Sequence, residues 1–464
     1  MEVQSSLVNY IYLASAVLFI LALKWMGQVK TARRGNWAGT AAMVLAVVGT
    51  IVAGKFSVEG YTWIAIAIVV GSAIGVPMAV IMPMTAVPQR TALSHAFGGL
   101  AAALVGLAEY HERAPEIPRF TSFALSAEML LGFLTFTGSM MAFGKLQDIV
   151  TTRPVVYPGR NAVSVGTLAT AVIAALYLTV DPGAFGALVV LICAALLFGI
   201  LLILPIGGAD MPTVIAILNS YAGLSASAMG FVLNNKLLIV AGALDGTSGL
   251  ILSIMMCKAM NRSFVNVLFG AVGQVATGPG TSQAGKTVTG YTVEDAKAVL
   301  EDTRLVIIVP GYGMAVAQAQ HAVKELADTL AKQGTDVKFA IHPVAGRMPG
   351  HMNVLLAEAD VPYDQLWELE RINPMFPEAD VAIVLGANDV TNPAARTNKQ
   401  SPLYGMPILD VDKARTVIFV KRSMNPGFAG VDNELFYLDK TMLVFGDAKK
   451  VMTELLAALK DSGH

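Results

Sequence analysis

The chain is poor in charge. Asp, Glu, Lys and Arg make up 14% of its 464 residues, whereas a soluble domain carries about 25%. A wholly soluble protein is therefore excluded, and we expect most of the chain to lie in a bilayer. The net charge is −1, and the sequence has no basic stripe with interleaved aromatic residues. Nothing indicates nucleic-acid binding.

Cysteine is also scarce. The two cysteines, Cys193 and Cys257, both lie in apolar segments, and no CxxC pair is present. This argues against a disulfide framework and against a zinc site, so we expect no metal ion. The first apolar run, residues 7–23, has no basic segment before it and no small-residue cleavage signal after it. We interpret it as a retained membrane helix and not as a signal peptide.

The composition changes sharply along the chain. Long apolar runs fill the sequence up to about residue 262, and regular Lys, Asp and Glu appear after about residue 290. The segment between them is rich in Gly, Thr and Ser, as linkers are. We predict a membrane domain over 1–261, a linker over 262–290 and a soluble domain over 291–464.

The membrane part contains apolar segments long enough to cross about 30 Å of hydrocarbon. Their connections carry more Lys and Arg on one side than on the other, which places the N-terminus outside and the C-terminal domain in the cytoplasm. Gly, Ala and Ser in GGLAAALVG (98–106) and in LNSYAGLSASAMG (218–230) permit close helix contacts. The nine predicted spans are residues 7–24, 37–54, 61–82, 88–108, 121–144, 162–180, 185–207, 211–233 and 236–258.

A few polar residues lie within these spans. Ionisable groups at such depth usually face the interior of a bundle or a water path. His95 is either a proton relay, since an imidazole has an unperturbed pKa of about 6.5, or a hydrogen-bond partner between helices. Asn219 by itself is typical of interhelical hydrogen bonding, and Asp210 of a solvated helix cap. The sequence does not distinguish a functional from a structural role for Glu128 and Asp245.

Strands and helices alternate in the soluble part. This pattern predicts a Rossmann-like α/β domain with a parallel sheet and helices on both faces, whose ligands bind at the C-terminal ends of the strands. We expect strands at 305–309, 337–342, 381–385, 407–409, 416–420 and 442–445, and helices at about 315–333, 351–359 and 447–460.

The stretch LVIIVPGYGMAVAQ (305–318) places Gly311-Tyr312-Gly313 between a strand and a helix, the layout that binds dinucleotide pyrophosphates. A packing role explains such glycines equally well. The next strand ends without the carboxylate that holds the ribose of NAD, which argues against NAD. A 2′-phosphate needs cations, and Arg347 and the triplet Lys421-Arg422-Ser423 offer them, although the triplet also suits a solvated strand end.

Two further strand-end loops have unusual contents. GANDVTNPAA (386–395) is made mostly of small and amide-bearing residues that let a ring approach, with Asn388 and Asp389 as hydrogen-bonding groups. KRSMNPGFAGVDN (421–433) is long and contains glycine, so it can fold over a ligand as a lid.

Together with IHPVAGRMPGHMNVLLAEA, FGDAKK, IGGADMPTVIAILNSYAG and MCKAMNRSF, these strings resemble the beta subunit of proton-translocating NAD(P) transhydrogenase. The resemblance implies that NADP(H) binds here, that NAD(H) binds on an alpha subunit, and that hydride transfer between them is coupled to proton movement. It also implies a dimer of alpha-beta units in a bacterial inner membrane. Such a reaction needs no nucleophile or general base, only two aligned cofactors and exclusion of water.

The resemblance also implies roles for particular residues. His95 would be central to proton transfer, with Asn219 and Asp210 as supporting polar groups. Asp389 would link the nicotinamide state to protonation, and the Lys421 triplet would take the 2′-phosphate. The implied cofactor-binding residues are Gly311, Tyr312, Gly313, Val344, Ala345, Gly346, Arg347, Met348, Pro349, Gly386, Ala387, Asn388, Asp389, Val390, Gly405, Met406, Lys421, Arg422, Ser423, Met424, Asn425, Pro426, Gly427, Phe428, Asp447 and Ala448.

Two other classes of function compete with this interpretation. The first is a transporter or channel whose soluble domain senses a dinucleotide without redox chemistry. The second is a membrane scaffold with a decayed nucleotide fold, which the joint presence of cations, lid glycines and the GAND loop disfavours. Reduction of an NADP analogue by NADH in the presence of an NAD-binding partner would separate all three.

Overall fold

The computed structural model describes residues 2–28, 31–54, 56–152, 154–261, 263, 264, 267, 288–348, 350–401, 403–427 and 429–461. The chain divides into two compact units. The first unit comprises Met1–Pro205 and Val214–Ser253, and the second comprises Ile206–Thr213 and Ile254–His464.

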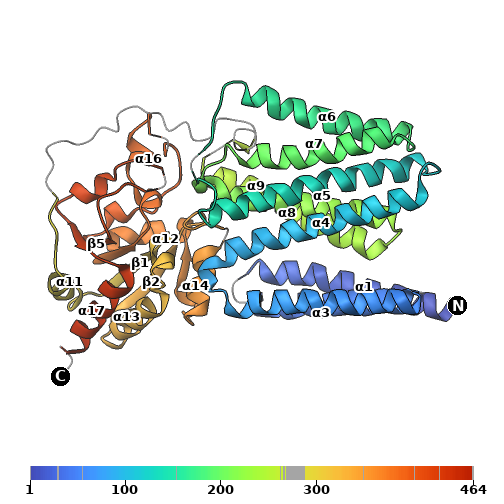
Figure 1. The fold of residues 1–464 in the computed structure, drawn as a ribbon. Helices are drawn as coiled ribbons and strands as arrows, with labels where there is room; N and C mark the ends of the chain where they lie inside the picture. Colours follow the sequence, from blue (N-terminus) through green and yellow to red (C-terminus); the bar gives the residue numbers. More distant parts are fainter. Residues whose placement is uncertain are drawn as a thin grey trace. The chain divides into compact units, whose positions relative to one another are not determined.

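Within the described residues, nine helices are long and apolar enough to cross a membrane, which confirms the predicted number of spans. In Figure 1, α4 to α7 run side by side, and α4 with α5 and α5 with α7 are in extensive contact. The nine helices are α1 (Glu2–Met26), α2 (Ala32–Ala53), α3 (Val58–Ile81), α4 (Val87–Arg113), α5 (Arg119–Leu146), α6 (Arg160–Val180), α7 (Phe185–Ile203), α8 (Met211–Val232) and α9 (Lys236–Ala259).

Small residues bring α4 and α5 together, as the sequence predicts. A Cβ atom added to Gly99 would lie 2.9 Å from the Gly132 carbonyl oxygen, and one added to Gly132 would lie 2.6 Å from the Gly99 carbonyl oxygen. The two backbones are therefore in contact, and a larger side chain at either position would force them apart. Glu128 of α5 is fully buried next to Gly106 of α4.

The second unit is built on a six-stranded parallel sheet in the order β3-β2-β1-β4-β5-β6. The central strands are apolar runs buried on both faces, which is typical of parallel sheets covered by helices. The predicted fold class is confirmed. The strands are β1 (Leu305–Pro310), β2 (Asp336–Ile341), β3 (Leu366–Glu368), β4 (Val381–Leu385), β5 (Thr416–Lys421) and β6 (Thr441–Phe445).

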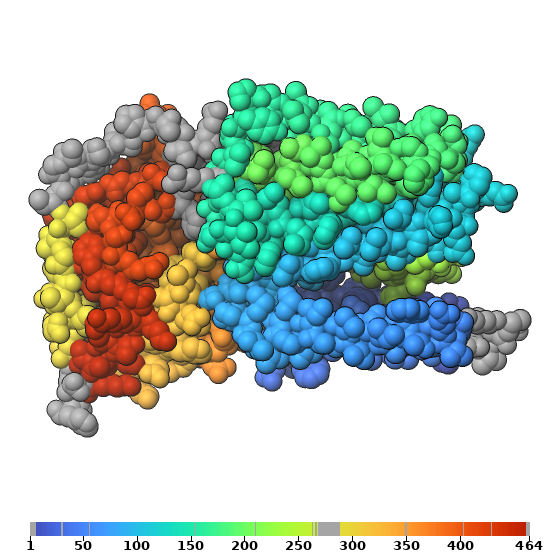
Figure 2. Space-filling view, in the orientation of Figure 1, coloured from blue at the N-terminus to red at the C-terminus, as the bar shows by residue number. Residues whose placement is uncertain are grey.

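Helices pack against this sheet. α17 contacts α11 and α13, and Figure 2 shows α11 in yellow beside the red C-terminal segment. The N-terminus of α11 is fixed by a capping box in which Thr292 and Asp295 exchange hydrogen bonds. The helices are α11 (Val293–Leu300), α12 (Tyr312–Val316), α13 (Gln320–Lys332), α14 (His351–Glu358), α15 (Leu369–Ile372), α16 (Ala394–Thr397) and α17 (Ala448–Asp461).

Three details differ from the sequence predictions. The strand predicted at 407–409 is absent: Ile408 and Leu409 are buried beside the sheet without joining it, and Leu409 N donates to Val390 O (2.9 Å) in a loop. The helix predicted over 315–333 is broken between α12 and α13, where Gln318 has φ +50°. The short strand β3 has no counterpart among the predicted strands.

Candidate functional site

The site begins where the strand order reverses. β1 and β4 are neighbours in the sheet although β2 and β3 come between them in the chain, and Pro310 pairs with Leu385 at their C-terminal ends. Ligands of doubly wound sheets bind in the crevice outside such a switch point. The loops carrying Tyr312 and Asn388 both start there.

Glycines bring these two loops into backbone contact. Gly311 N donates to Leu385 O (2.9 Å), and Gly313 N donates to Gly386 O (3.2 Å). A Cβ atom on Gly311 would lie 2.4 Å from Gly386 O, and one on Gly313 would lie 2.7 Å from Gly386 Cα. Packing alone thus requires glycine at both positions of the turn. The same lack of side chains leaves bare backbone at the crevice, which is what close approach of a pyrophosphate needs.

The segment after β2 brings a cation, Arg347, and an imidazole ring, His351, beside Tyr312. The Arg347 guanidinium lies 4.5 Å from the centre of the Tyr312 ring, and the His351 ring centre lies 6.3 Å from it. Arg347 N donates to His351 Nδ1 (3.1 Å), and burial, helped by the Arg347 charge, lowers the pKa of His351 to about 4. His351 is therefore a neutral ring that accepts at Nδ1. Of the residues predicted around it, Pro349 lies outside the described residues.

A second histidine fixes the start of this loop. His342 is buried, its Nε2 lies 2.8 Å from Pro407 O, and its Nδ1 accepts from Val344 N (3.2 Å). Burial lowers the pKa of His342 to about 4, so the ring is neutral and donates from Nε2. Through these two hydrogen bonds, His342 connects Val344 to Pro407, which follows Gly405 and Met406 in the chain. Gly405 has φ +78°, a conformation that only glycine adopts without strain.

The loops after β4 and β5 are linked through Asp389. Its Oδ1 accepts from Asn388 Nδ2 (3.1 Å), and its Oδ2 accepts from Ala429 N (2.9 Å). Asn433 Nδ2 also donates to Asn388 O (3.0 Å). The loop predicted to be a lid is therefore folded back on the GAND loop. Its residue Phe428 lies outside the described residues.

The predicted phosphate cations differ in their surroundings. Lys421 ends β5, its Nζ lies 3.8 Å from the centre of the Phe436 ring, and it donates to Asn425 O (3.4 Å). Burial lowers the pKa of Lys421 to about 8, opposed by the nearby carboxylates of Asp432 and Asp389. Arg422 and Ser423 are exposed. Lys421 therefore contacts Phe436 and Asn425 and feels the charges of Asp432 and Asp389.

Asp447 has a structural role of its own. Its Oδ1 accepts from Lys449 N (3.1 Å) and from Lys450 N (3.3 Å), so it caps α17 just before the buried Ala448. Gly446 N donates to Lys421 O (3.0 Å), which keeps the ends of β5 and β6 together.

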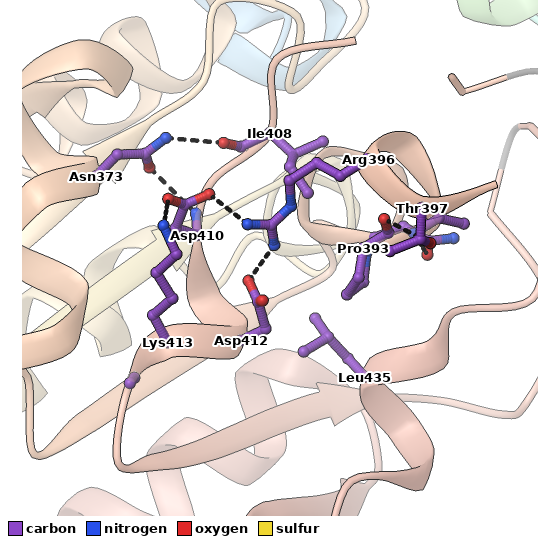
Figure 3. Close-up of polar contacts among 12 residues, drawn as sticks. Asn373, Pro393, Arg396, Thr397, Ile408, Asp410, Asp412, Lys413 and Leu435 are labelled. Carbon is purple, nitrogen blue, oxygen red and sulfur yellow. Dashed lines mark hydrogen bonds and ion pairs between the residues drawn. The ribbon is translucent and has the colours of Figure 1, made fainter. Parts of the chain in front are cut away.

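A polar cluster supports the segment after Met406 (Figure 3). Arg396 pairs with Asp410 (3.2 Å) and with Asp412, and Lys413 pairs with Asp410 (2.6 Å). Asn373 Nδ2 donates to Ile408 O (2.9 Å). Sequence reasoning missed this cluster because Arg396 and Asn373 come from segments distant from Asp410 in the chain, and no local pattern joins them.

In the first unit, three polar residues from three helices come together. The Asn219 side chain of α8 is a hydrogen-bonding neighbour of the His95 ring of α4. Asn219 Nδ2 also donates to Asp245 of α9, to its Oδ1 (3.2 Å) and to its backbone oxygen (3.3 Å). The sequence singled out all three residues, but only the packing of the helices shows that they meet.

Asp210 corrects a prediction. We expected a solvated carboxylate, but Asp210 is only 5% exposed. It ends the 3-10 turn Gly208–Asp210 between the buried Ile206 and Met211, so the turn itself places the side chain inside the protein. Asp210 belongs to the second unit, whereas His95 and Asn219 belong to the first.

These features define a multi-span membrane protein with a Rossmann-type domain. The family model described as NAD(P) transhydrogenase beta subunit matches residues 8–458. The chain is also 49% identical over 466 residues to NAD(P) transhydrogenase subunit beta of Rhodospirillum rubrum, covering 98% of this chain and 99% of the relative, and it matches the protein of that name from a particular strain of this species equally well. The chain belongs to the NAD(P) transhydrogenase beta subunit family.

Membership of this family makes the chain a subunit of an NAD(P) transhydrogenase, which is an oxidoreductase. It implies use of the two nicotinamide dinucleotides, and being a beta subunit implies an alpha subunit as partner. The apolar helices and the family together indicate a membrane protein.

Proposed function

We propose that the second unit binds NADP(H) and that the first carries protons, with hydride exchanged between this NADP(H) and NAD(H) on the alpha subunit. The observation that supports this most is the convergence of groups outside β1, β2, β4 and β5. Tyr312 and Arg347 lie together there, and so do Asp389 and the lid loop. In this proposal, residues 291–464 form the cofactor domain and residues 1–261 the translocating domain.

The residues present fit a dinucleotide with a 2′-phosphate. Glycine backbone is bare where a pyrophosphate would approach, at Gly311 and Gly313. β2 is followed by His342, which is buried and neutral, so this strand end offers no carboxylate for a ribose 2′-hydroxyl. Lys421 and Arg422 provide positive charge at the end of β5. This combination favours NADP(H) over NAD(H).

The bound nicotinamide supplies the hydride chemistry. The protein has to hold the dinucleotide, align it with its partner and keep water away. Tyr312 and Arg347 stack beside the glycine turn and would hold one end, while Lys421 and Arg422 would hold the 2′-phosphate. The lid, fixed to Asp389 through Ala429 N, would cover the ligand, and the protonation of Asp389 would follow the cofactor state.

We place the N-terminus outside a bacterial inner membrane and the cofactor domain in the cytoplasm, in a dimer of alpha-beta units. Within the membrane, His95 would load and release protons, and Asn219 would orient it. The buried Asp210 would be a supporting polar group for proton transfer.

The test uses this chain assembled with its alpha subunit in vesicles. With NADH and an NADP analogue whose reduced form absorbs at a distinct wavelength, the complex should reduce the analogue and change the internal pH. A channel regulated by a dinucleotide would bind the analogue without reducing it, and a scaffold would not bind it. Either result would overturn the proposal.

A further inference from the structure

The helices α8 and α9 touch through their backbones. A Cβ atom on Gly223 would lie 2.3 Å from Gly246 N, and one on Gly249 would lie 2.7 Å from Ser220 N. Ser220 Oγ donates to Gly246 O (2.7 Å), which adds a hydrogen bond across the same contact. Such close approach lets short side chains of one helix reach the other.

Asn219 uses this closeness to join two ionisable groups. Its amide nitrogen donates to Asp245 Oδ1 (3.2 Å) and to Asp245 O (3.3 Å), and its side chain neighbours the His95 ring. His95 Nδ1 is buried and has no hydrogen-bond partner. One neutral amide therefore lies between an imidazole and a carboxylate.

Asp245 lies well inside its span. It is about 14 Å from the start of α9 at 1.5 Å per residue, and a carboxylate at the centre of a membrane helix costs about 2.5–3.5 kcal/mol. The described length of α8 contains no charged residue, and the other charged residues of α9, Lys236 and Lys258, are near its ends. His95 is the group of α4 at this contact. The other ionisable residues of that helix lie more than one turn away along it: Arg90, Glu109, His111, Glu112 and Arg113. The Asp245 side chain is exposed on the first unit, so no buried ion pair explains it.

We propose that Asp245 exchanges a proton with His95, and that Asn219 positions both groups. This inference rests on the proposed function of the first unit. In the step, a ring N–H bond of the imidazolium breaks and an O–H bond forms on Asp245. A charged pair becomes a neutral imidazole and a neutral carboxylic acid, and no electrons are transferred. The amide of Asn219 carries no proton itself; it occupies Oδ1 and leaves Oδ2 to accept.

The first experiment uses the assembled alpha-beta complex in vesicles. Asp245→Asn keeps the shape and an oxygen that accepts from Asn219, but it removes the titratable group. We expect at least a tenfold loss of both coupled hydride transfer and proton uptake, in a complex that still binds NADP(H). Asp245→Glu should restore most of the rate. Thr247→Val, an exposed position two residues further along α9, is the matched control and should behave as wild type.

The second experiment reads protonation directly. Infrared difference spectra of the complex with NADP⁺ and with NADPH should contain the C=O band of a protonated carboxylic acid, shifted in D₂O and absent from Asp245→Asn. A structural carboxylate would give no such band.

The outcomes separate this inference from the proposed function. Asp245→Asn that pumps at the wild-type rate and with the wild-type number of protons per NADPH overturns the inference and leaves the proposed function standing. A second outcome is an equal loss of activity in Asp245→Asn and Asp245→Glu, with poor assembly of both and no carboxylic acid band in the wild type. It would give Asp245 a structural role and would also overturn the inference. If the wild-type complex neither transfers hydride nor takes up protons, both proposals fail.

Discussion

The two units arrange their candidate chemistry in opposite ways. In the first unit, a few polar side chains meet in an apolar surrounding, and His95, Asn219 and Asp245 come from three different helices. In the second unit, many groups from several strand ends line one crevice, and we expect each of them to contribute only part of the binding free energy. A polar group in a membrane interior is costly, and such groups commonly mark proton or ion paths. A single substitution should therefore abolish coupled activity in the first unit, whereas in the second unit it should reduce cofactor affinity or activity only in part.

The largest effect is expected at His95. We expect that His95→Ala in the assembled complex abolishes proton uptake and coupled hydride transfer together, because Ala removes the imidazole that would load and release the proton. NADP(H) binding to the complex should be unchanged, since the cofactor residues belong to the other unit. Vesicle acidification is measured against NADPH formed, per folded complex.

Ser94→Ala is the matched control for His95, because Ser94 precedes it on α4 and is exposed. A His95→Ala complex that is less stable but moves the normal number of protons per NADPH would show that the ring only bonds helices together. The half of the comparison that concerns the first unit would then be wrong.

The next largest effect concerns nucleotide choice. If Lys421 and Arg422 hold the 2′-phosphate, replacing both with Gln removes two charge-assisted contacts of about 1.5–3 kcal/mol each. NADP affinity should fall roughly 10²- to 10⁴-fold. NAD lacks that phosphate, so its weak binding should barely change. Calorimetry on both nucleotides checks this, with Lys460→Gln near the end of α17 as control.

Each single replacement should cause about half of that loss in free energy, as expected for a site of many contacts. Equal losses for NADP and NAD would contradict the phosphate assignment. A single replacement that removes all binding would contradict the comparison itself, because the second unit would then depend on one group.

The sequence predicted those parts of the fold that follow from local pattern. β1, β4 and β5 are unbroken apolar runs, so their positions could be predicted to within one residue. The same rule, that a short apolar run is a buried strand, failed at 407–409. Ile408 and Leu409 are buried beside the sheet without pairing with a strand, and the sequence does not distinguish the two cases. The break at Gln318 depends on one left-handed residue, which periodicity does not reveal.

The candidate site shows the same limit. The sequence could predict that Tyr312 and Arg347 follow strands β1 and β2, since parallel strands end at one edge. It could not predict that Asn219 meets Asp245, because this contact depends on the rotation of two helices set by glycine packing. Nor could it predict that Asp389 holds Ala429, forty residues away.

Asp389 should give an intermediate effect. Asp389→Asn keeps one acceptor oxygen and replaces the other with an NH₂ group, which donates. Either the hydrogen bond from Ala429 N or the one from Asn388 Nδ2 is therefore lost. Loss of one hydrogen bond of about 1–1.5 kcal/mol predicts roughly tenfold slower coupled transfer in a complex that still folds. Hydride and proton rates are measured together, and wild-type values for both would rule out a role of this carboxylate in coupling.

The effect that is smallest near neutral pH is a pH dependence of NADP affinity. Burial lowers the pKa of Lys421 to about 8, against its ordinary value of 10.5. Below pH 8 the ammonium is charged and NADP affinity should not vary with this group. Above pH 8 the amine must first take up a proton before it can hold the phosphate. Affinity should therefore fall by up to tenfold per pH unit, until the pH reaches the higher pKa that the bound anion gives to Lys421.

A series of calorimetric titrations between about pH 7.5 and 10 measures this slope. Lys421→Arg should bind NADP without it, because a guanidinium stays charged over the whole range. NAD binding should be flat in both proteins, since it brings no phosphate to Lys421. A flat NADP profile in the wild type would mean that Lys421 keeps its position over Phe436 as a packing residue only, and Arg422 would then be the main phosphate cation.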